Sequence, residues 1–191
     1  AFGFMDWRDG TVAGVKARVF RISFTGELSY EINVPAHYGR HVWEQLIEAG
    51  SEFNITPYGT ETMHVLRAEK GFIIVGQDTD GSMTPADMNM NWVVGKNKVF
   101  SFIGKRSLER SDSIRENRKQ LVGLKTLEPN AVLAEGAQIV NAPNQPIPMA
   151  MQGHVTSSYY SASLGHSIAL AVVKGGLNRM GDVVYCPAAD G

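Results

Sequence analysis

The sequence predicts an α+β domain followed by an antiparallel β barrel. Residues 16–34 alternate between two faces, which is the period of a β-strand, around a glycine-containing turn. Residues 36–49 show the spacing of an amphipathic helix, and residues 60–70 carry the end signals of a second helix. Across residues 119–186 the helical period disappears, and Gly, Pro and Asn separate short strand-like runs. This change of pattern predicts one domain in residues 1–115 and a second, all-β domain in residues 116–191.

A β-hairpin is expected within the first of these segments. In residues 16–25, and again in residues 28–34, every second side chain shares a face. The three residues from Thr25 to Glu27 read as a short turn, because Gly26 supplies a positive φ. The two strands are therefore expected to pair across a tight connection.

Two helices are expected next. Residues 36–49 carry an apolar stripe and end before Gly50, which would terminate the helix. Residues 60–70 form the second helix, with Thr60 as its N-cap and Gly71 as its terminator.

The connection between the domains is expected to be mostly irregular. Residues 72–75 are apolar and predict a short buried strand, and residues 76–85 read as a loop. Pro85 would begin a short helix, with Asp87 near its N-terminal dipole. Residues 104–119 are rich in charge and predict a solvated helix followed by a linker.

The composition excludes several classes of protein. The net charge is −1, so the basic excess of a typical nucleic-acid-binding domain is absent. The longest apolar stretches, such as residues 167–173, are far too short to span a bilayer. Cys186 is the only cysteine, which rules out an intrachain disulfide and a cysteine-based zinc cluster. These features favour a soluble cytoplasmic protein that binds neither nucleic acid nor membrane.

The usual catalytic motifs are missing from the sequence. It contains no GxGxxG, P-loop, HExxH or GxSxG pattern. We therefore expect no flavin or NAD to be bound by this segment, and we assign no catalytic residue. His37 and His41 have the i, i+4 spacing of metal ligands, but no nearby carboxylate or cysteine completes a set. An exposed polar face, without a metal, is expected there.

Residues 24–31 (FTGELSYE) form the first candidate binding segment. Glu27 and Glu31 flank the turn, with Phe24 and Tyr30 beside them. A carboxylate can accept two parallel N–H bonds from a planar heterocycle, and an aromatic ring can stack on its face. A pterin offers such an edge. An ordinary exposed hairpin has the same residue pattern, so both interpretations stay open.

Residues 65–71 (VLRAEKG) form the second candidate segment. Arg67 and Glu69 lie two positions apart on a helix, so their side chains face different sides. One of them could reach a ligand while the other makes a structural pair. A plain surface helix is the alternative.

Several segments together resemble the glycine-cleavage T-protein (aminomethyltransferase) family. RISFTGELSYEINVP is similar to its hairpin and MHVLRAEKG to its later helix. GSMTPADM with Trp92, FIGKRSL and VTSSYYSASLGHSIALAVV are similar to the following segments and the barrel motif, in family order. The form HVLRAEKGFIIVGQDTDG is closer to the alpha subunits of heterotetrameric sarcosine oxidases than to the glycine-cleavage protein.

This resemblance implies the second half of a T-protein-like folate-binding domain followed by the C-terminal barrel. It also implies a tetrahydrofolate site. Glu31 would hold the amide-like edge of the pterin, Phe24 and Tyr30 would lie beside the ligand, and Arg67 would position folate or support Glu31. The family's catalytic carboxylate would precede residue 1. The chain opens on Ala1 within the pattern AFGFMDWRDG and closes on AADG, so both ends are expected to be cuts through a longer protein, and the isolated fragment is expected to be inactive.

The implied function is the tetrahydrofolate-binding part of a sarcosine oxidase alpha subunit. Such a part transfers the one-carbon unit of oxidised sarcosine to tetrahydrofolate, giving 5,10-methylenetetrahydrofolate, while a flavin-bearing beta subunit oxidises the amine. A glycine-cleavage-type aminomethyltransferase and a non-catalytic assembly module stay open. A folate-dependent tRNA-modifying relative is disfavoured, because its cysteine motif and basic charge are missing.

Overall fold

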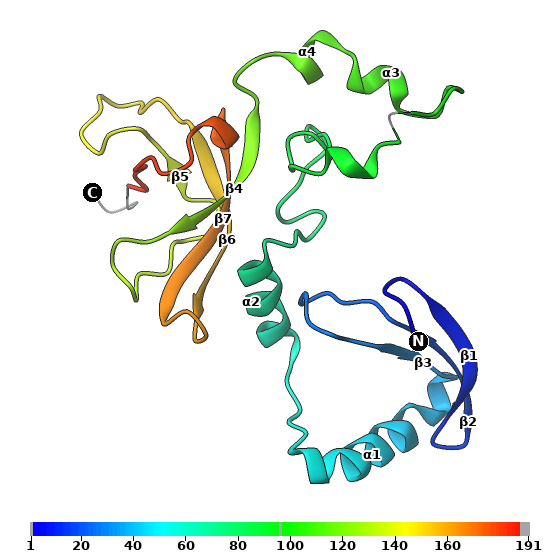
Figure 1. Cartoon of the computed structure of the whole chain (residues 1–191). Coiled ribbons are helices and arrows are strands. Elements are labelled where there is room, and N and C mark those ends of the chain that lie inside the picture. The colour runs from blue at the N-terminus through cyan, green and yellow to red at the C-terminus, as the bar shows by residue number, and fades with distance from the viewer. Residues whose placement is uncertain (1, 96, 188–191) are drawn as a thin grey trace. The chain divides into compact units, whose positions relative to one another are not determined.

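A computed structural model describes residues 2–95 and 97–187 of the chain (Figure 1). The chain divides into two compact units, one within residues 1–72 and the other within residues 73–191. Both helices and strands are present, which confirms the predicted α+β class. The predicted domains, residues 1–115 and 116–191, stay a prediction.

The first unit contains a three-stranded antiparallel sheet. Its strands are β1 (Trp7–Val12), β2 (Val15–Phe20) and β3 (Glu31–Asn33), in the order β1-β2-β3. The pairing of β2 with β3 confirms the predicted antiparallel partners. Strand β1 was not predicted, because glycine and charged residues interrupt any alternation in WRDGTV.

The predicted tight turn between β2 and β3 is wrong, since residues 21–30 form a longer loop. Inside it, the Gly26 amide donates to Ser23 Oγ (2.8 Å) and the side chain of Thr25 is buried. A side chain that accepts a hydrogen bond from a nearby backbone amide takes the place of a sheet hydrogen bond at that amide. The alternation of residues 21–25 therefore continues past the point where strand pairing ends.

Helices α1 (Gly39–Gly50) and α2 (Thr60–Lys70) match the two predicted helices. Gly50 does not terminate α1 as predicted. A 3-10 turn continues the chain to Asn54, whose φ of 57° ends the helical segment. Gly71 does terminate α2, with a φ of 77°. Thr60 is not the N-cap of α2, because Gly59 takes that position.

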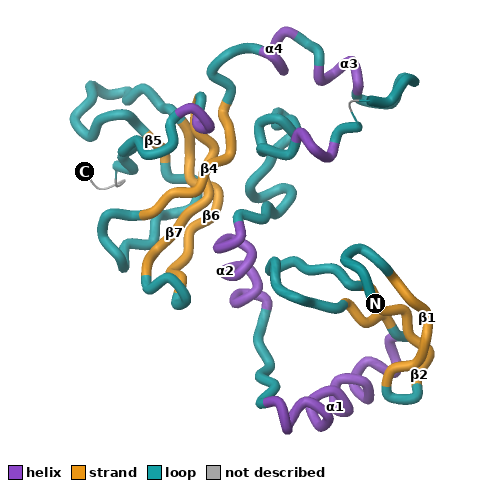
Figure 2. Tube along the Cα trace, in the orientation of Figure 1, coloured by secondary structure: helices purple, strands orange, loops and turns teal. Residues whose placement is uncertain are grey.

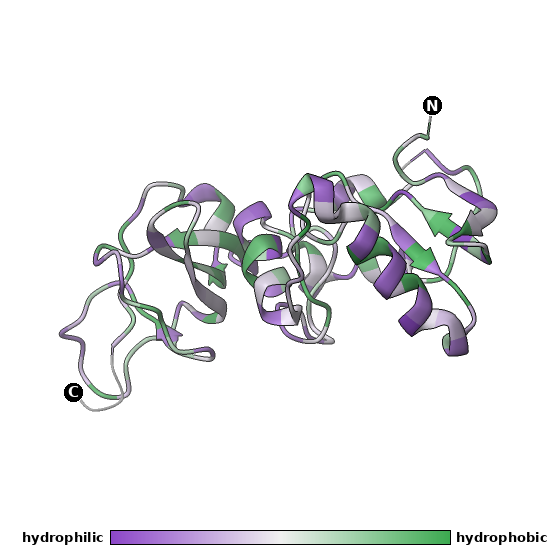
Figure 3. Cartoon of the chain, turned by 90° about the horizontal axis from the view of Figure 1, so that it is seen from below, coloured by the Kyte–Doolittle hydropathy of each residue, from purple (hydrophilic) through white to green (hydrophobic). Residues whose placement is uncertain are grey.

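Helix α1 has hydrophilic and hydrophobic residues in alternating bands along its length (Figure 3). Val42 is its buried residue, and Val15 and Ala17 of β2 are also buried. One face of the sheet therefore contributes to the core of this unit.

The second unit contains a curled, four-stranded antiparallel half-barrel (Figure 2). Its order is β4-β7-β6-β5, with β4 (Lys119–Lys125), β5 (Gln138–Ile139), β6 (Gly153–Ser161) and β7 (His166–Lys174). Its core consists of buried apolar residues: Ile139, Val155, Ala169, Ala171 and Val173. In the described part of residues 126–187 the helical structure is one 3-10 turn, Gly176–Asn178. This confirms the predicted β module.

Three predictions for the intervening segment are wrong. Pro85 begins no helix, because residues 85–89 form turns. Residues 72–75 form no strand, and Val75 is 83% exposed. Residues 104–119 contain two single helical turns, α3 (Lys105–Leu108) and α4 (Ser111–Ile114), because Arg110 between them is extended.

A buried carboxylate ties the start of this unit to the sheet. Asp78 Oδ1 accepts hydrogen bonds from the hydroxyls of Thr156 (2.5 Å) and Ser157 (2.7 Å), while Oδ2 accepts one from the Ile74 amide (2.8 Å). A β-bulge at Thr156 in β6 places both hydroxyls there. The irregular chain before β4 is thus fixed by polar contacts.

A buried ion pair ties the same irregular chain to the first residue before β4. Arg118 donates to both carboxylate oxygens of Asp87 (Nε–Oδ1 2.8 Å, Nη2–Oδ2 2.7 Å). Arg118 also donates to the Ser82 carbonyl (2.6 Å) and to the exposed carboxylate of Asp112 (2.8 Å). Burial raises the pKa of Asp87, but hydrogen bonds from Arg118 and Thr84 outweigh it and hold that pKa below its ordinary value.

Replacing Asp87 by Asn is expected to lower the free energy of unfolding by roughly 3 kcal/mol at pH 7, since it leaves a buried guanidinium partly uncompensated. A lowered carboxyl pKa stabilises the fold above the unfolded pKa of about 3.9, and this stabilisation disappears as pH falls through the folded pKa. The urea-unfolding curves of Asp87→Asn and wild type, followed by far-UV circular dichroism, should therefore converge in acid.

The matched control is Asp112→Asn, which removes the exposed partner of the same guanidinium and should shift the urea midpoint much less. Equal midpoints for Asp87→Asn and wild type at pH 7 would contradict a stabilising role for the buried pair.

Candidate functional site

Glu31 is the first residue of β3 and lies opposite Phe20 of β2. Its side chain is exposed, and its Oε1 accepts a hydrogen bond from the side-chain Nδ2 of Asn33 (3.0 Å). Among the described residues no ion pair involves Glu31. The carboxylate is therefore available as a hydrogen-bond acceptor.

Arg18 of β2 and Arg21, which follows that strand, both have other partners. Arg18 pairs with Asp9 through two contacts, Nε–Oδ1 at 2.8 Å and Nη2–Oδ2 at 3.1 Å. Arg21 donates to the Phe2 carbonyl (3.1 Å). A structural ion pair is the main alternative to ligand binding at a strand carboxylate, and Glu31 forms none with any residue that the structure describes.

The two aromatic candidates, Phe24 and Tyr30, are both substantially exposed, at 40% and 48%. The ring of Tyr30 lies against that of Phe2, with centroids 5.6 Å apart. Phe24 belongs to the loop that precedes Glu31. Exposed aromatic rings on a loop can stack on a planar ligand.

Arg67 differs from the other candidates because it is fully buried. Its Nη1 donates to the Phe72 carbonyl (3.1 Å), just beyond the end of α2. The Phe72 amide in turn donates to the Arg67 carbonyl (2.9 Å). Arg67 therefore stabilises the turn that ends α2, and the neighbouring Glu69 is only half-buried.

The two candidate segments meet at Gly26. A Cβ placed on this residue would lie 2.6 Å from Lys70 Cγ, so the loop backbone packs directly on the last residue of α2. Gly26 also has a φ of 84°, which disfavours other residues. The loop of residues 21–30 and the end of α2 consequently lie side by side within the first unit (Figure 1).

The exposed sheet face contains functional candidates that the sequence did not reveal. Cross-strand pairing places Trp7, Phe20 and Glu31 in one row, and Asp9, Arg18 and Asn33 in the next. The Arg18 guanidinium stacks over the Trp7 ring at 4.3 Å. The alternation of Arg18 and Phe20 was visible in the sequence, but the rows also depend on β1 and on the register.

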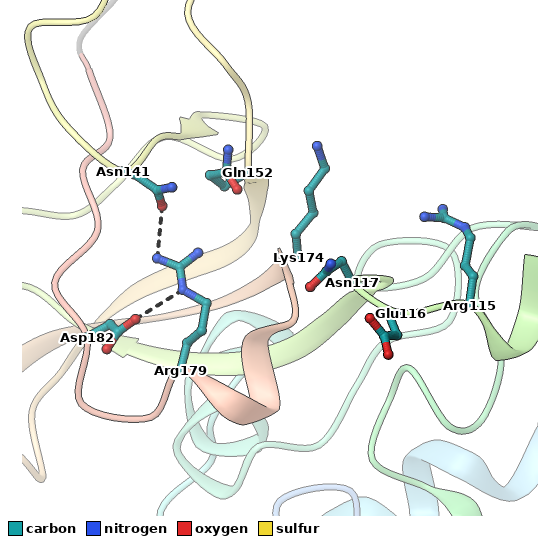
Figure 4. A pocket seen from close by; sticks show the side chains of 8 residues that line it. All are labelled: Arg115, Glu116, Asn117, Asn141, Gln152, Lys174, Arg179 and Asp182. Carbon is teal, nitrogen blue, oxygen red and sulfur yellow. Dashed lines mark hydrogen bonds and ion pairs between the residues drawn. The ribbon is translucent and has the colours of Figure 1, made fainter.

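A separate polar hollow of about 810 Å³ lies in the second unit (Figure 4). It is lined by cations, carboxylates and amides: Arg115, Lys174, Arg179, Glu116, Asp182, Asn117, Asn141 and Gln152. Two of its cations are already paired, since Arg115 contacts Asp112 (2.7 Å) and Arg179 contacts Asp182 (3.1 Å). Figure 4 shows Arg179 held between Asp182 and Asn141. This lining indicates a structural network more than a ligand site.

The histidine and cysteine side chains suggest no further centre. His41 Nε2 lies 3.0 Å from the Ala13 carbonyl, and the His37 ring packs on Tyr38. Burial raises the pKa of Cys186, so its thiol stays protonated at neutral pH. Within residues 2–95 and 97–187, no cluster of His, Cys, Asp or Glu could hold a metal ion. Over the same residues, no helix has both the length and the apolar character that crossing a membrane requires.

Two family models match the chain. The "GCVT N-terminal domain" matches residues 1–98, and the "Glycine cleavage T-protein C-terminal barrel domain" matches residues 119–191.

Curated relatives share both matched parts. The sarcosine oxidase subunit alpha of Corynebacterium sp. (strain P-1) is 54% identical over 190 residues, which cover 98% of this chain and 19% of the relative. The subunit of the same name from Rhizobium meliloti (strain 1021) is 39% identical over 186 residues, covering 96% and 19%. The aminomethyltransferase of Halothermothrix orenii is 33% identical over 171 residues, covering 90% and 45%. The chain thus spans about a fifth of the length of the two sarcosine oxidase subunits and less than half of the length of the aminomethyltransferase.

The fold is also found in a solved structure. The glycine cleavage system aminomethyltransferase T from Bartonella henselae superposes with a TM-score of 0.79 over 97% of this chain and 48% of that chain. The two sequences are 24% identical, so this likeness concerns the fold.

Gly26→Ala is expected to lower the free energy of unfolding by about 1–2 kcal/mol, because a left-handed backbone is costly for alanine. Crowding by Lys70 should add to the loss. Gly10→Ala is the matched control, since a Cβ on that strand residue meets no atom within 4 Å. Urea unfolding measures the free energy of unfolding of both alanine variants. Adding Lys70→Ala to Gly26→Ala separates the effect of crowding by Lys70 from that of backbone strain. Equal stability of the two alanine variants would contradict the packing of the loop on α2.

Proposed function

The chain belongs to the glycine cleavage T-protein family, and from that membership we propose that it is the folate-binding part of a sarcosine oxidase alpha subunit. The identity of 54% with such a subunit supports this assignment over the more distant aminomethyltransferases. The structural observation that carries it is the exposed Glu31 carboxylate, which has an amide neighbour and no ion-pair partner among the described residues.

Glu31 binds the pterin in this proposal. The pterin edge presents a ring N–H and an exocyclic amine side by side, and a carboxylate can accept both hydrogen bonds. Phe24 and Tyr30 supply exposed aromatic surface near the same loop. A planar ligand would be covered by these rings and oriented by Glu31.

Arg67 has an indirect role in the proposal. Because it is buried and bonds the Phe72 carbonyl, it stabilises the end of α2 on which the loop packs through Gly26. We therefore propose that Arg67 supports the loop that presents Phe24 and Glu31. Direct contact between Arg67 and folate is not required.

Tetrahydrofolate acts as the acceptor of the one-carbon unit. Its N5 attacks the methylene carbon of the imine formed from sarcosine, glycine leaves, and closure by N10 gives 5,10-methylenetetrahydrofolate. This chain contributes positioning, which lets two bound reactants meet with the correct orientation. In this proposal the amine is oxidised elsewhere, on a flavin-bearing beta subunit. We also propose that the assembled enzyme is cytoplasmic.

The two matched parts, residues 1–98 and 119–191, support the division of this chain into a folate-binding domain (1–115) and a C-terminal barrel (116–191). A glycine-cleavage-type aminomethyltransferase is the second candidate, and the relatives at 33% identity favour it. In that case tetrahydrofolate would bind at the same residues, but the one-carbon donor would not be sarcosine.

In the complete natural protein, Glu31→Gln is expected to weaken tetrahydrofolate binding about 30- to 150-fold. The side-chain NH₂ of glutamine would face an N–H donor of the pterin edge. One charge-assisted hydrogen bond is then lost and that pterin N–H is left unpaired, at a cost of about 2–3 kcal/mol. Isothermal titration with 5-formyltetrahydrofolate, a stable reduced folate, measures the change. Oxidation of sarcosine should continue, with formaldehyde released in place of methylene-folate.

Glu27→Gln is the control, because this exposed carboxylate lies on the same loop. It should change the affinity much less. Folate affinity within about twofold of wild type in Glu31→Gln would exclude Glu31 as the pterin ligand. No folate binding by the wild-type protein would favour a non-catalytic assembly role.

A further inference from the structure

Glu31 has a cationic neighbour that does not neutralise it. Arg18 lies two residues from Phe20 along β2, so it is the diagonal cross-strand neighbour of Glu31. Diagonal neighbours on one sheet face are about 7–8 Å apart, within reach of a long side chain. A guanidinium bonded to the carboxylate through its fork geometry would occupy the lone pairs that a pterin edge requires.

Asp9 and Trp7 hold the Arg18 guanidinium elsewhere. Asp9 lies opposite Arg18 on β1 and receives two of its N–H bonds, at 2.8 and 3.1 Å. Trp7 lies beneath the same guanidinium, 4.3 Å from it. The hydrogen bond from Arg18 keeps the pKa of Asp9 below its ordinary value, so the pair stays charged at neutral pH. Strand β1 thus draws the cation away from β3.

Asn33 occupies the position next to Glu31 on the same face of β3. Its amide nitrogen donates to Glu31 Oε1 at 3.0 Å, while cross-strand pairing puts Asn33 opposite Arg18. A neutral donor orients the carboxylate without cancelling its charge. The carboxylate retains acceptor positions, because two oxygens provide about four lone-pair sites.

We infer that Asp9 and Asn33 are positioning residues for Glu31. Asp9 retains Arg18 on β1, and Asn33 fixes the orientation of the Glu31 carboxylate, so that this group meets its ligand as an oriented, unpaired anion. The inference rests on the proposed function, because it concerns how Glu31 binds the donor edge of a pterin. It assigns a binding role to β1, a strand that contains none of the residues expected to touch folate.

The test uses the complete natural protein and isothermal titration with 5-formyltetrahydrofolate. Asn33→Ala should weaken binding about two- to tenfold, the effect of an ordinary hydrogen bond. In the Glu31→Gln background the same substitution should change the affinity less than about twofold, because Asn33 acts through Glu31. A purely structural role would give equal losses in both backgrounds.

Asp9→Asn should weaken binding about two- to fivefold, since Arg18 is then released to pair with Glu31. Arg18→Met in the Asp9→Asn background should restore the affinity, because the competing cation is gone while the apolar contact with Trp7 remains. Rescue of this kind is not expected if Asp9 only stabilises the sheet.

Two substitutions on α1 serve as matched controls. Gln45→Ala removes an exposed amide–carboxylate hydrogen bond of the same 3.0 Å length, and Glu44→Gln breaks the exposed ion pair with Arg40. Neither should change folate affinity. Far-UV circular dichroism checks that each variant folds, and the thermal midpoints of variants and controls should agree within a few degrees.

The outcomes separate the inference from the function on which it rests. If Glu31→Gln weakens binding but Asn33→Ala and Asp9→Asn do not, the positioning roles are wrong and the folate site stands. If Arg18→Met fails to rescue Asp9→Asn, the role of Asp9 is wrong. If Glu31→Gln itself has no effect, the folate site and the inference are both wrong.

Discussion

The register of the three-stranded sheet is the constraint on which the candidate site depends. Val15 and Ala17 of β2 are buried, whereas Arg18 and Phe20 lie in the rows that include Asn33 and Glu31. Side chains alternate along a strand, so a shift of one residue between β2 and β3 would turn Glu31 toward the core. Burial of small apolar residues on one face thus determines which groups the other face presents.

The second unit is fixed in a different way, by buried polar groups. The chain from residue 73 to residue 118 contains little regular structure, yet Asp78 and Asp87 within it are almost fully buried. Each carboxylate is satisfied, one by the hydroxyls of the β6 bulge and the other by Arg118. Leaving such groups unpaired is costly, which restricts this segment to arrangements that satisfy them.

The sequence predicted the features that follow from local periodicity. The antiparallel partners β2 and β3, helix α2 with Gly71 at its end, and the β module all have such patterns. Two of the errors occur where one side chain overrides the pattern: Ser23 Oγ accepts a hydrogen bond from the Gly26 amide in the loop, and the Asp78 carboxylate accepts one from the Ile74 amide in a turn. These hydrogen bonds depend on the loop or the tertiary structure, so a sequence periodicity of two or 3.6 residues cannot indicate them.

The candidate site was predictable to a similar extent. Glu31, Phe24 and Tyr30 were predicted as ligand contacts; all three are exposed, and their contact with folate stays a proposal. The burial of Arg67 was not predicted, because arginine is usually exposed and its carbonyl partner, Phe72, lies beyond the helix. Asp9 and Asn33 were missed because they become neighbours of Arg18 only through cross-strand pairing.

The most direct measurement of the proposed role is a crystal structure of the complete natural protein with 5-formyltetrahydrofolate. We expect both Glu31 oxygens to lie about 2.7–3.2 Å from the ring N–H and the exocyclic amine of the pterin. Arg18 should still be paired with Asp9 in that complex. A pterin edge bound by another acceptor, or a Glu31 carboxylate paired with Arg18 beside the bound folate, would contradict the proposed role.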